Sequence, residues 1–114
     1  MSRDWLLFLD DAIKCCRLIL SFTDGMNLDS FQNDPRTYHA TLRQIEMIGE
    51  AVKFIPEDIR ANYPGVAWQA VIATRNILTH VYFGIDDDII WGIISTEIEP
   101  LMKTLKEIRL HGAS

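Results

Sequence analysis

Apolar residues recur at three- and four-residue spacings along almost the whole of this 114-residue chain. This spacing lines them up along one side of an α-helix, whereas a half-buried strand would alternate apolar and polar residues. Over residues 4–23 the repeat is carried by Leu6, Leu9, Ile13, Cys16 and Leu20. No stretch shows sustained strand alternation between turn signals, so the sequence predicts an all-α fold.

Capping and turn residues indicate where the first two helices begin and end. Asp4 can cap the first helix, and Gly25 can stop it. Asp34 followed by Pro35 is typical of an N-cap with proline in the first helical position. The second helix is therefore expected over about residues 35–54.

The second half of the chain carries signals for three more helices. One short helix is expected within "IPEDIRANYPG", and a long one is expected over residues 66–82. Aspartates at 86–88 favour the start of the last helix, which Pro100 should bend. The prediction is one domain over residues 1–114, an antiparallel bundle of four long helices plus one short helix.

Composition limits the classes of function. The chain is 48% hydrophobic and 24% charged, which is typical of a packed core. Its net charge of −5 argues against broad, passive binding to nucleic acid, although a locally basic site remains compatible with it. Adjacent Cys15 and Cys16 favour reduced core residues. There is no signal-peptide pattern and no apolar run long enough for a membrane span, so a cytoplasmic protein is expected.

The helix expected over residues 66–82 has two distinct faces. Its core face is predicted to consist of Ala70, Val71, Thr74, Ile77, Leu78 and Val81. With Arg75 at zero on a helical wheel, the second face carries polar residues at about −20° (Tyr82), 40° (Thr79), 100° (Asn76) and 140° (His80). Trp68 and Ile72 fall on this second face as well. Such a mixture is typical of a partly buried polar site or a protein interface.

Each of these polar residues has an ordinary interpretation when taken alone. His80 could be a surface or satisfied interior histidine, Arg75 a salt-bridge residue, and Tyr82 a core-edge tyrosine with a bonded hydroxyl. Glu46 and Glu50 lie one turn apart and could bind a metal or hold the arginine of the site. Ordinary pairing with Arg43 and Lys53 is favoured for them, and His39 has no assigned role.

The stretch "TRNILTHVYFGIDDDIIW" resembles the signature of the HepT-like branch of the HEPN superfamily. That signature is an arginine, four residues, a histidine, one residue and a tyrosine, and it is met here by Arg75, His80 and Tyr82. Asn76 occupies the polar position that often follows the arginine. "LRQIEMIGEAVKFIPEDIRANYPGVAWQAVIATRN" also resembles the preceding helices of the family, so the likeness covers nearly the whole chain.

The resemblance implies a metal-independent ribonuclease in which the ribose 2′-OH attacks the neighbouring phosphodiester. In this interpretation His80 transfers protons, Arg75 pairs with phosphate oxygens, Asn76 orients the phosphate or the imidazole, and Thr79 supports them. No metal site and no cofactor are expected. The resemblance further implies an MntA-like minimal nucleotidyltransferase as antitoxin, which transfers AMP to Tyr82.

Helical geometry raises a difficulty for this site. Arg75 and His80 differ by about 140° around the helix and about 7.5 Å along it. A two-fold homodimer, which the resemblance also implies, would bring two copies of each to one cleft. Apolar residues that could cover such an interface are Trp5, Leu7, Phe8, Trp68 and Trp91.

Two functions therefore remain open from the sequence. One is a ribonuclease toxin acting on an RNA such as transfer RNA or messenger RNA. The other is a non-catalytic dimeric HEPN module that pairs with a nucleotidyltransferase. The intact motif favours the first, and the acidic charge favours the second or a toxin with a narrow set of RNA targets.

Overall fold

The computed structural model describes residues 4–80 and 86–112 of the chain. Within its fifth helix, the side chains of Arg75, Asn76, Ile77, Thr79 and His80 fall outside this description. Every regular element in the described residues is helical, which confirms the predicted all-α class. None of the helices in this part of the chain combines the length and apolar character needed to cross a membrane.

The four predicted long helices are present. They are α1 (Trp5–Phe22), α3 (Pro35–Val52), α5 (Trp68–His80) and α7 (Ile98–Gly112). Between them lie the short helices α2 (Leu28–Gln32), α4 (Glu57–Arg60) and α6 (Asp87–Gly92), together with a π-helical turn, η1 (Ile93–Glu97). The predicted last helix therefore comprises α6, η1 and α7 in direct succession, and the count of one short helix was too low.

The helix starts show which capping predictions were right. The carboxylate of Asp34 accepts a hydrogen bond from the Thr37 N–H at 3.2 Å, with Pro35 first in the helix. Gly25 has a φ of 75°, the left-handed conformation that stops α1 without strain. Asp4 occupies the N-cap position of α1 but makes no capping hydrogen bond through its side chain. Its backbone is already helical there, whereas capping side chains usually extend from a β-region residue.

Helix α2 is not among the helices expected from the sequence. Its start is a capping box in which Asn27 Oδ1 accepts from the Ser30 N–H at 2.9 Å. The Ser30 hydroxyl oxygen in turn accepts from the Asn27 N–H at 3.0 Å. Phe31 is fully buried, so this one short turn contributes a large side chain to the core.

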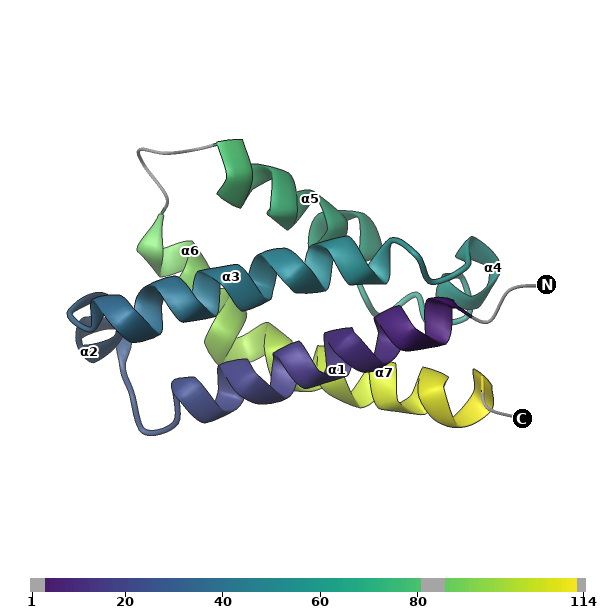
Figure 1. Cartoon of the computed structure of the whole chain (residues 1–114), viewed down its shortest axis with the longest axis horizontal. Coiled ribbons are helices and arrows are strands. Elements are labelled where there is room, and N and C mark those ends of the chain that lie inside the picture. The colour runs from purple at the N-terminus through teal and green to yellow at the C-terminus, as the bar shows by residue number, and fades with distance from the viewer. Residues whose placement is uncertain (1–3, 81–85, 113–114) are drawn as a thin grey trace.

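Pro100 explains the π turn in the last helical stretch. Proline lacks an N–H, and its ring crowds the carbonyl four residues earlier, which here is that of Thr96. The η1 turn inserts extra backbone just before it, and the Ile98 N–H bonds the Ile93 carbonyl five residues back. In Figure 1, α6 and α7 run in clearly different directions, which confirms the expected bend.

In the main contacts between the long helices, each helix packs on one or two of the others. Helix α1 packs against both α3 and α7, and α5 packs on α3 (Figure 1). One apolar stripe of the last helical stretch is buried, at Ile90, Ile94, Ile98, Leu101, Leu105 and Ile108. Because α5 and α7 rest on different neighbours, a groove of about 580 Å³ lies between them.

The groove corrects the predicted core face of α5. Val71 and Leu78 pack against the core as expected. Ala70, however, is exposed and borders the groove, because α5 meets α3 on one side only. The groove is lined on one wall by Ala70, Val71 and Thr74 and on the other by Ile93, Pro100 and Leu101.

Candidate functional site

Four of the five predicted site residues lie on α5. This helix is continuous from Trp68 to His80, so it includes positions 75, 76, 79 and 80. Their side chains lie outside the described residues, as does Tyr82, which belongs to the segment 81–85. A continuous helix keeps Arg75 and His80 about 7.5 Å apart along the axis and about 140° apart around it. Positions 75 and 80 therefore lie on different sides of one copy of α5.

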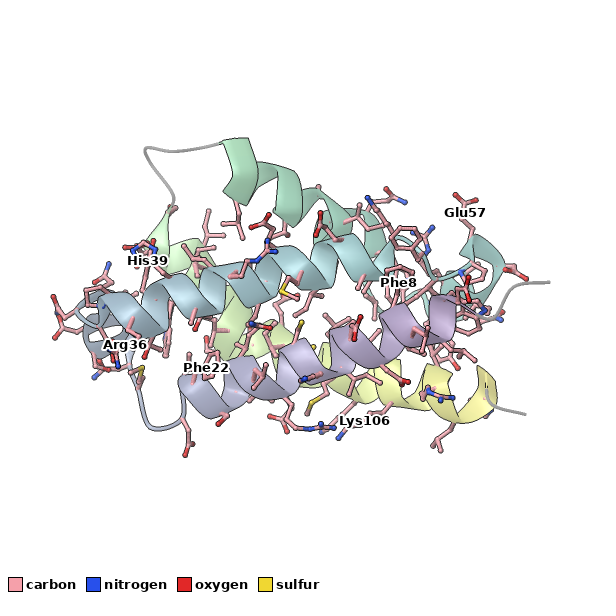
Figure 2. All side chains as sticks on the ribbon, in the orientation of Figure 1. Phe8, Phe22, Arg36, His39, Glu57 and Lys106 are labelled. Carbon is pink, nitrogen blue, oxygen red and sulfur yellow. The ribbon has the colours of Figure 1, made fainter. Side chains whose placement is uncertain are left out.

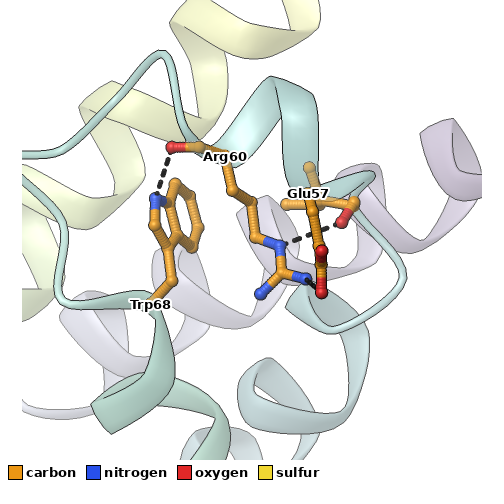
Figure 3. A network of polar contacts seen from close by, with 4 residues as sticks. Glu57, Arg60 and Trp68 are labelled. Carbon is orange, nitrogen blue, oxygen red and sulfur yellow. Dashed lines mark hydrogen bonds and ion pairs between the residues drawn. The ribbon is translucent and has the colours of Figure 1, made fainter.

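Trp68 does not rim this face as the helical wheel suggested. It is only 8% exposed. Its indole N–H donates to the carbonyl oxygens of Arg60 at 3.0 Å and Tyr63 at 3.1 Å. The segment that precedes α5 folds back over the start of the helix and covers the ring (Figure 3). Trp68 thus joins α4 to α5 instead of offering interface area.

The other apolar residues proposed for an interface are mostly packed within the chain. The Phe8 ring stacks on Phe54 with centroids 4.1 Å apart. Trp5 and Trp91 are partly buried against the core. Only Leu7 is clearly exposed, at 66%. Of the expected apolar surface, Leu7 is exposed, Trp5, Phe8 and Trp91 keep part of their surface, and Trp68 is buried.

The charged stripe of α3 behaves as ordinary pairing predicts. Arg43 and Glu46 form an ion pair of 3.3 Å between neighbouring turns. Glu50 also has an interaction of its own, so neither acid is a free ligand. Across residues 4–80 and 86–112, no group of three histidines, cysteines or acids is placed to hold a metal ion.

A polar tie at the start of α6 was not foreseen from the sequence. The Tyr38 hydroxyl donates to Asp87 Oδ1 at 2.5 Å, and Gln32 Nε2 donates to Asp87 Oδ2 at 3.1 Å. Burial, together with the hydrogen bond to Asp87 and its negative charge, raises the pKa of Tyr38 to about 12. Asp86, the N-cap of α6, directly follows the segment that carries Tyr82. The tie thereby fixes the point at which the chain leaves that segment.

His39 lies beside this tie. Its ring stands edge-on to Tyr38, with centroids 5.4 Å apart, and its side chain is exposed. Figure 2 shows it on α3, close to α6. The sequence alone could not place this histidine, because the fold brings it there from a separate helix.

Comparison with known proteins decides the family. The model of the family described as "Ribonuclease HepT-like" matches residues 12–108. This chain belongs to that ribonuclease HepT-like family. The match confirms the resemblance that the motif of Arg75, His80 and Tyr82 indicated.

Relatives of similar length support the same assignment. A candidate RNase of Methanocaldococcus jannaschii is 40% identical over 107 residues, which cover 94% of this chain and 88% of the relative. A candidate RNase of Caldanaerobacter subterraneus is 36% identical, with 89% and 90% covered. A Thermococcus cleftensis protein named "Probable ribonuclease HepT" is 32% identical, with 96% and 99% covered. No solved structure gives a significant match.

Proposed function

We propose that this chain is a metal-independent endoribonuclease toxin that uses Arg75 and His80. The observation that carries the proposal is the ribonuclease family match over residues 12–108, which includes the motif on α5. The relatives that span nearly the whole chain carry RNase names, which supports RNA as the substrate class.

The proposed chemistry needs proton transfer and charge stabilisation. The ribose 2′-oxygen attacks the adjacent phosphorus while a base removes its proton. The bond from phosphorus to the 5′-oxygen breaks, and that oxygen takes up a proton. Histidine suits such proton transfers near neutral pH, so His80 is assigned to them. Arg75 stabilises the negative charge on the phosphorane through its planar fork, with Asn76 and Thr79 in supporting positions.

We place this reaction at a cleft shared by two copies of the chain. The separation of Arg75 and His80 on one helix supports a site in which each copy contributes one of the two groups. A two-fold axis beside α5 would bring a second α5 close to the first. The groove between α5 and α7 provides apolar surface next to that helix.

The test is cleavage of cellular RNA by the purified chain in the presence of EDTA. The wild-type chain should cut, and Arg75→Ala and His80→Ala should each lower the rate by about 10²–10⁴-fold. His111→Ala, which removes an exposed histidine at the end of α7, is the matched control and should retain full activity. If wild-type protein leaves RNA intact, or His80→Ala cuts equally well, the non-catalytic HEPN module becomes the better interpretation.

Control by an antitoxin is the second part of the proposal. An MntA-like nucleotidyltransferase would transfer AMP to the hydroxyl of Tyr82, forming a phosphodiester and displacing the leaving group of the AMP donor. The added phosphate would place negative charge near Arg75 and repel RNA. Intact-mass measurement after co-expression with such an enzyme should show one or more AMP additions on the wild-type chain and none on Tyr82→Phe. An unchanged mass in a neutralised complex would mean that the partner inhibits by binding alone.

A further inference from the structure

Arg60 is a buried cation whose donors are mostly unused. Its side chain is 10% exposed, and its Nε donates to the Ile55 carbonyl at 3.0 Å. A guanidinium has four more N–H donors on its two terminal nitrogens. Among the described residues these make no hydrogen bond. Their one ionic neighbour is Glu57 at 3.9 Å, and that carboxylate is 92% exposed.

The terminal nitrogens reach solvent, because Thr41 Oγ1 is the one fully buried side-chain polar atom without a partner in the described part of the chain. Water screens the ion pair between Arg60 and the almost fully exposed Glu57, so a more highly charged anion can compete for the guanidinium. Figure 3 shows the Arg60 side chain between the indole of Trp68 and the carboxylate of Glu57. The guanidinium is thus held in place while its terminal nitrogens remain available.

Arg60 borders an open hollow of about 550 Å³. The start of α5 forms another part of its wall, through Trp68, Gln69 and Ala70. The Trp68 N–H bonds the Val66 carbonyl, whereas the amides of Gln69 and Ala70 donate no hydrogen bond within the described part of the chain. Unpaired first-turn amides at the positive end of a helix are a favourable environment for a phosphate.

The hollow lies on the motif side of α5. Position 69 falls within about 20° of positions 76 and 80 on the helical wheel. It is about 16 Å from position 80 along the axis, at 1.5 Å for each residue. A nucleic acid strand that follows this side of α5 would therefore pass the hollow and then the motif.

We propose that Arg60 and the first turn of α5 bind a backbone phosphate of the RNA, a few nucleotides away from the bond that is cut. This inference rests on the proposed ribonuclease function and adds a second anchoring point for the substrate. The guanidinium supplies charge and paired donors, and the amides of Gln69 and Ala70 supply further donors. Arg60 does not touch the reacting atoms, so it is a binding residue and not a catalytic one.

Glu57 is the counter-ion of Arg60 in the structure. Its carboxylate lies 3.9 Å from the guanidinium and would repel an incoming phosphate. Since the side chain is almost fully exposed, it can rotate away at small cost. Replacing it with glutamine should therefore strengthen phosphate binding without disturbing the core.

The competing explanation is that Arg60 only ties α4 to the Ile55 carbonyl. Under that explanation, removal of the arginine lowers stability but leaves the affinity of the folded protein for RNA unchanged. Glu57→Gln would then have no effect on RNA at all. The salt dependence of binding separates the two explanations, because it counts the phosphates that a protein neutralises.

The experiment measures binding of a single-stranded RNA by the His80→Ala chain, which does not cut it, across a range of salt concentrations. Adding Arg60→Gln should raise the Kd roughly tenfold and reduce the slope of log affinity against log salt by about 0.7. Arg60→Lys should keep the slope, and Glu57→Gln should lower the Kd by up to about fivefold. Arg17→Gln, at an exposed arginine of α1, is the control and should change neither quantity by as much.

The proposal is overturned if a folded Arg60→Gln variant has the same Kd for RNA as its parent and the same slope of log affinity against log salt. If that variant fails to fold, an unchanged Kd for Glu57→Gln overturns it instead. Titration with inorganic phosphate, followed through the amide signals of Gln69 and Ala70, separates the remaining cases. Phosphate binding that depends on Arg60, in a chain that binds no RNA, would refute the RNA assignment and the proposed function together. RNA cleavage with no effect of Arg60 or Glu57 on binding would refute this inference alone.

Discussion

The buried hydroxyl of Thr41 lowers the stability of the folded protein. It is completely buried, and its hydroxyl has no hydrogen-bond partner among the described residues. An unmet buried hydroxyl costs about 1–3 kcal/mol of desolvation. Thr41→Val replaces the hydroxyl with a methyl group of similar size, so it should raise the free energy of unfolding by about 1 kcal/mol. Urea unfolding monitored by circular dichroism measures this change.

The matched control is Thr23→Val. The Thr23 hydroxyl is also buried, but it donates to the Ile19 carbonyl at 2.8 Å. Its removal should lower the free energy of unfolding by about 1 kcal/mol. Equal effects of the two substitutions, in either direction, would show that hydrogen-bond satisfaction does not govern these positions.

Tyr38 should make stability depend on alkaline pH. Its pKa is raised from 10.0 to about 12 in the folded protein, because burial and Asp87 favour the neutral hydroxyl. The folded state therefore holds this proton over a pH range in which the unfolded chain loses it. The stabilisation is complete below pH 10 and is lost as the pH rises towards 12. Tyr38→Phe should be less stable than wild type at pH 8, and the difference should shrink by pH 11.

Urea unfolding of both proteins at pH 8 and pH 11 provides the measurement. Other groups that titrate in this range are common to both chains and cancel in the difference. A stability difference that stays constant between the two pH values would show that the tie between Tyr38 and Asp87 does not depend on the phenolic proton.

At the scale of elements, the π turn η1 is attributed to Pro100. Pro100→Ala restores an N–H that can bond the Thr96 carbonyl and removes the clash of the ring. A helix-interior proline costs about 3 kcal/mol, and alanine gives the unfolded chain about 1 kcal/mol more conformational entropy. The variant should therefore be more stable by about 1–2 kcal/mol. Pro64→Ala, in the loop before α5, is the control and should give no such gain.

Hydrogen exchange of the amides from 97 to 101 reports the local effect. Conversion of η1 to a regular α-helix should give the variant a protected amide at residue 100, where proline has none, and should increase the protection of the amides at residues 97–99. If stability falls and the exchange pattern is unchanged, packing against the groove, and not the proline, maintains the π turn.

Three helix boundaries were predictable because a local chemical rule acts within a few residues. Asp34 with Pro35, Gly25, and the aspartates at 86–88 all mark real boundaries. The short α2 was missed although its capping signal, Asn27 and Ser30, is local as well. The turn residues around it masked that signal, and five residues are too few to show helical periodicity.

The sequence predicted where the site residues lie along α5. It did not predict which other residues pack around that helix. A helical wheel fixes directions relative to one helix, so it grouped positions 75, 76, 79 and 80 without showing what covers them. Trp68 was misassigned because the α4 segment folds back over it. The bond from Tyr38 to Asp87 joins residues 49 apart in sequence, and no local pattern carries such a pairing.

At the scale of the whole molecule, the arrangement of α5 is incomplete in two respects. The helix packs mainly on α3, so the groove beside it lacks a covering element among the described residues. Positions 75 and 80 lie about 140° apart around the helix, so we expect one copy not to bring both side chains to one phosphate. A second copy that packs beside α5 would address both features at once.

The chain should therefore form a homodimer, and sedimentation at micromolar concentration should report about twice the 13.1 kDa mass of one chain. Ala70→Glu places a charge on an exposed groove position, so it should shift the protein towards monomer, with the helical circular dichroism signal retained. Ser21→Glu adds the same charge at an exposed position of α1 and should leave the measured mass unchanged. A wild-type monomer that cuts RNA at full rate would contradict the shared cleft, because one α5 would then suffice. If Ala70→Glu leaves the dimer intact, the interface lies elsewhere on the molecule and does not cover the groove.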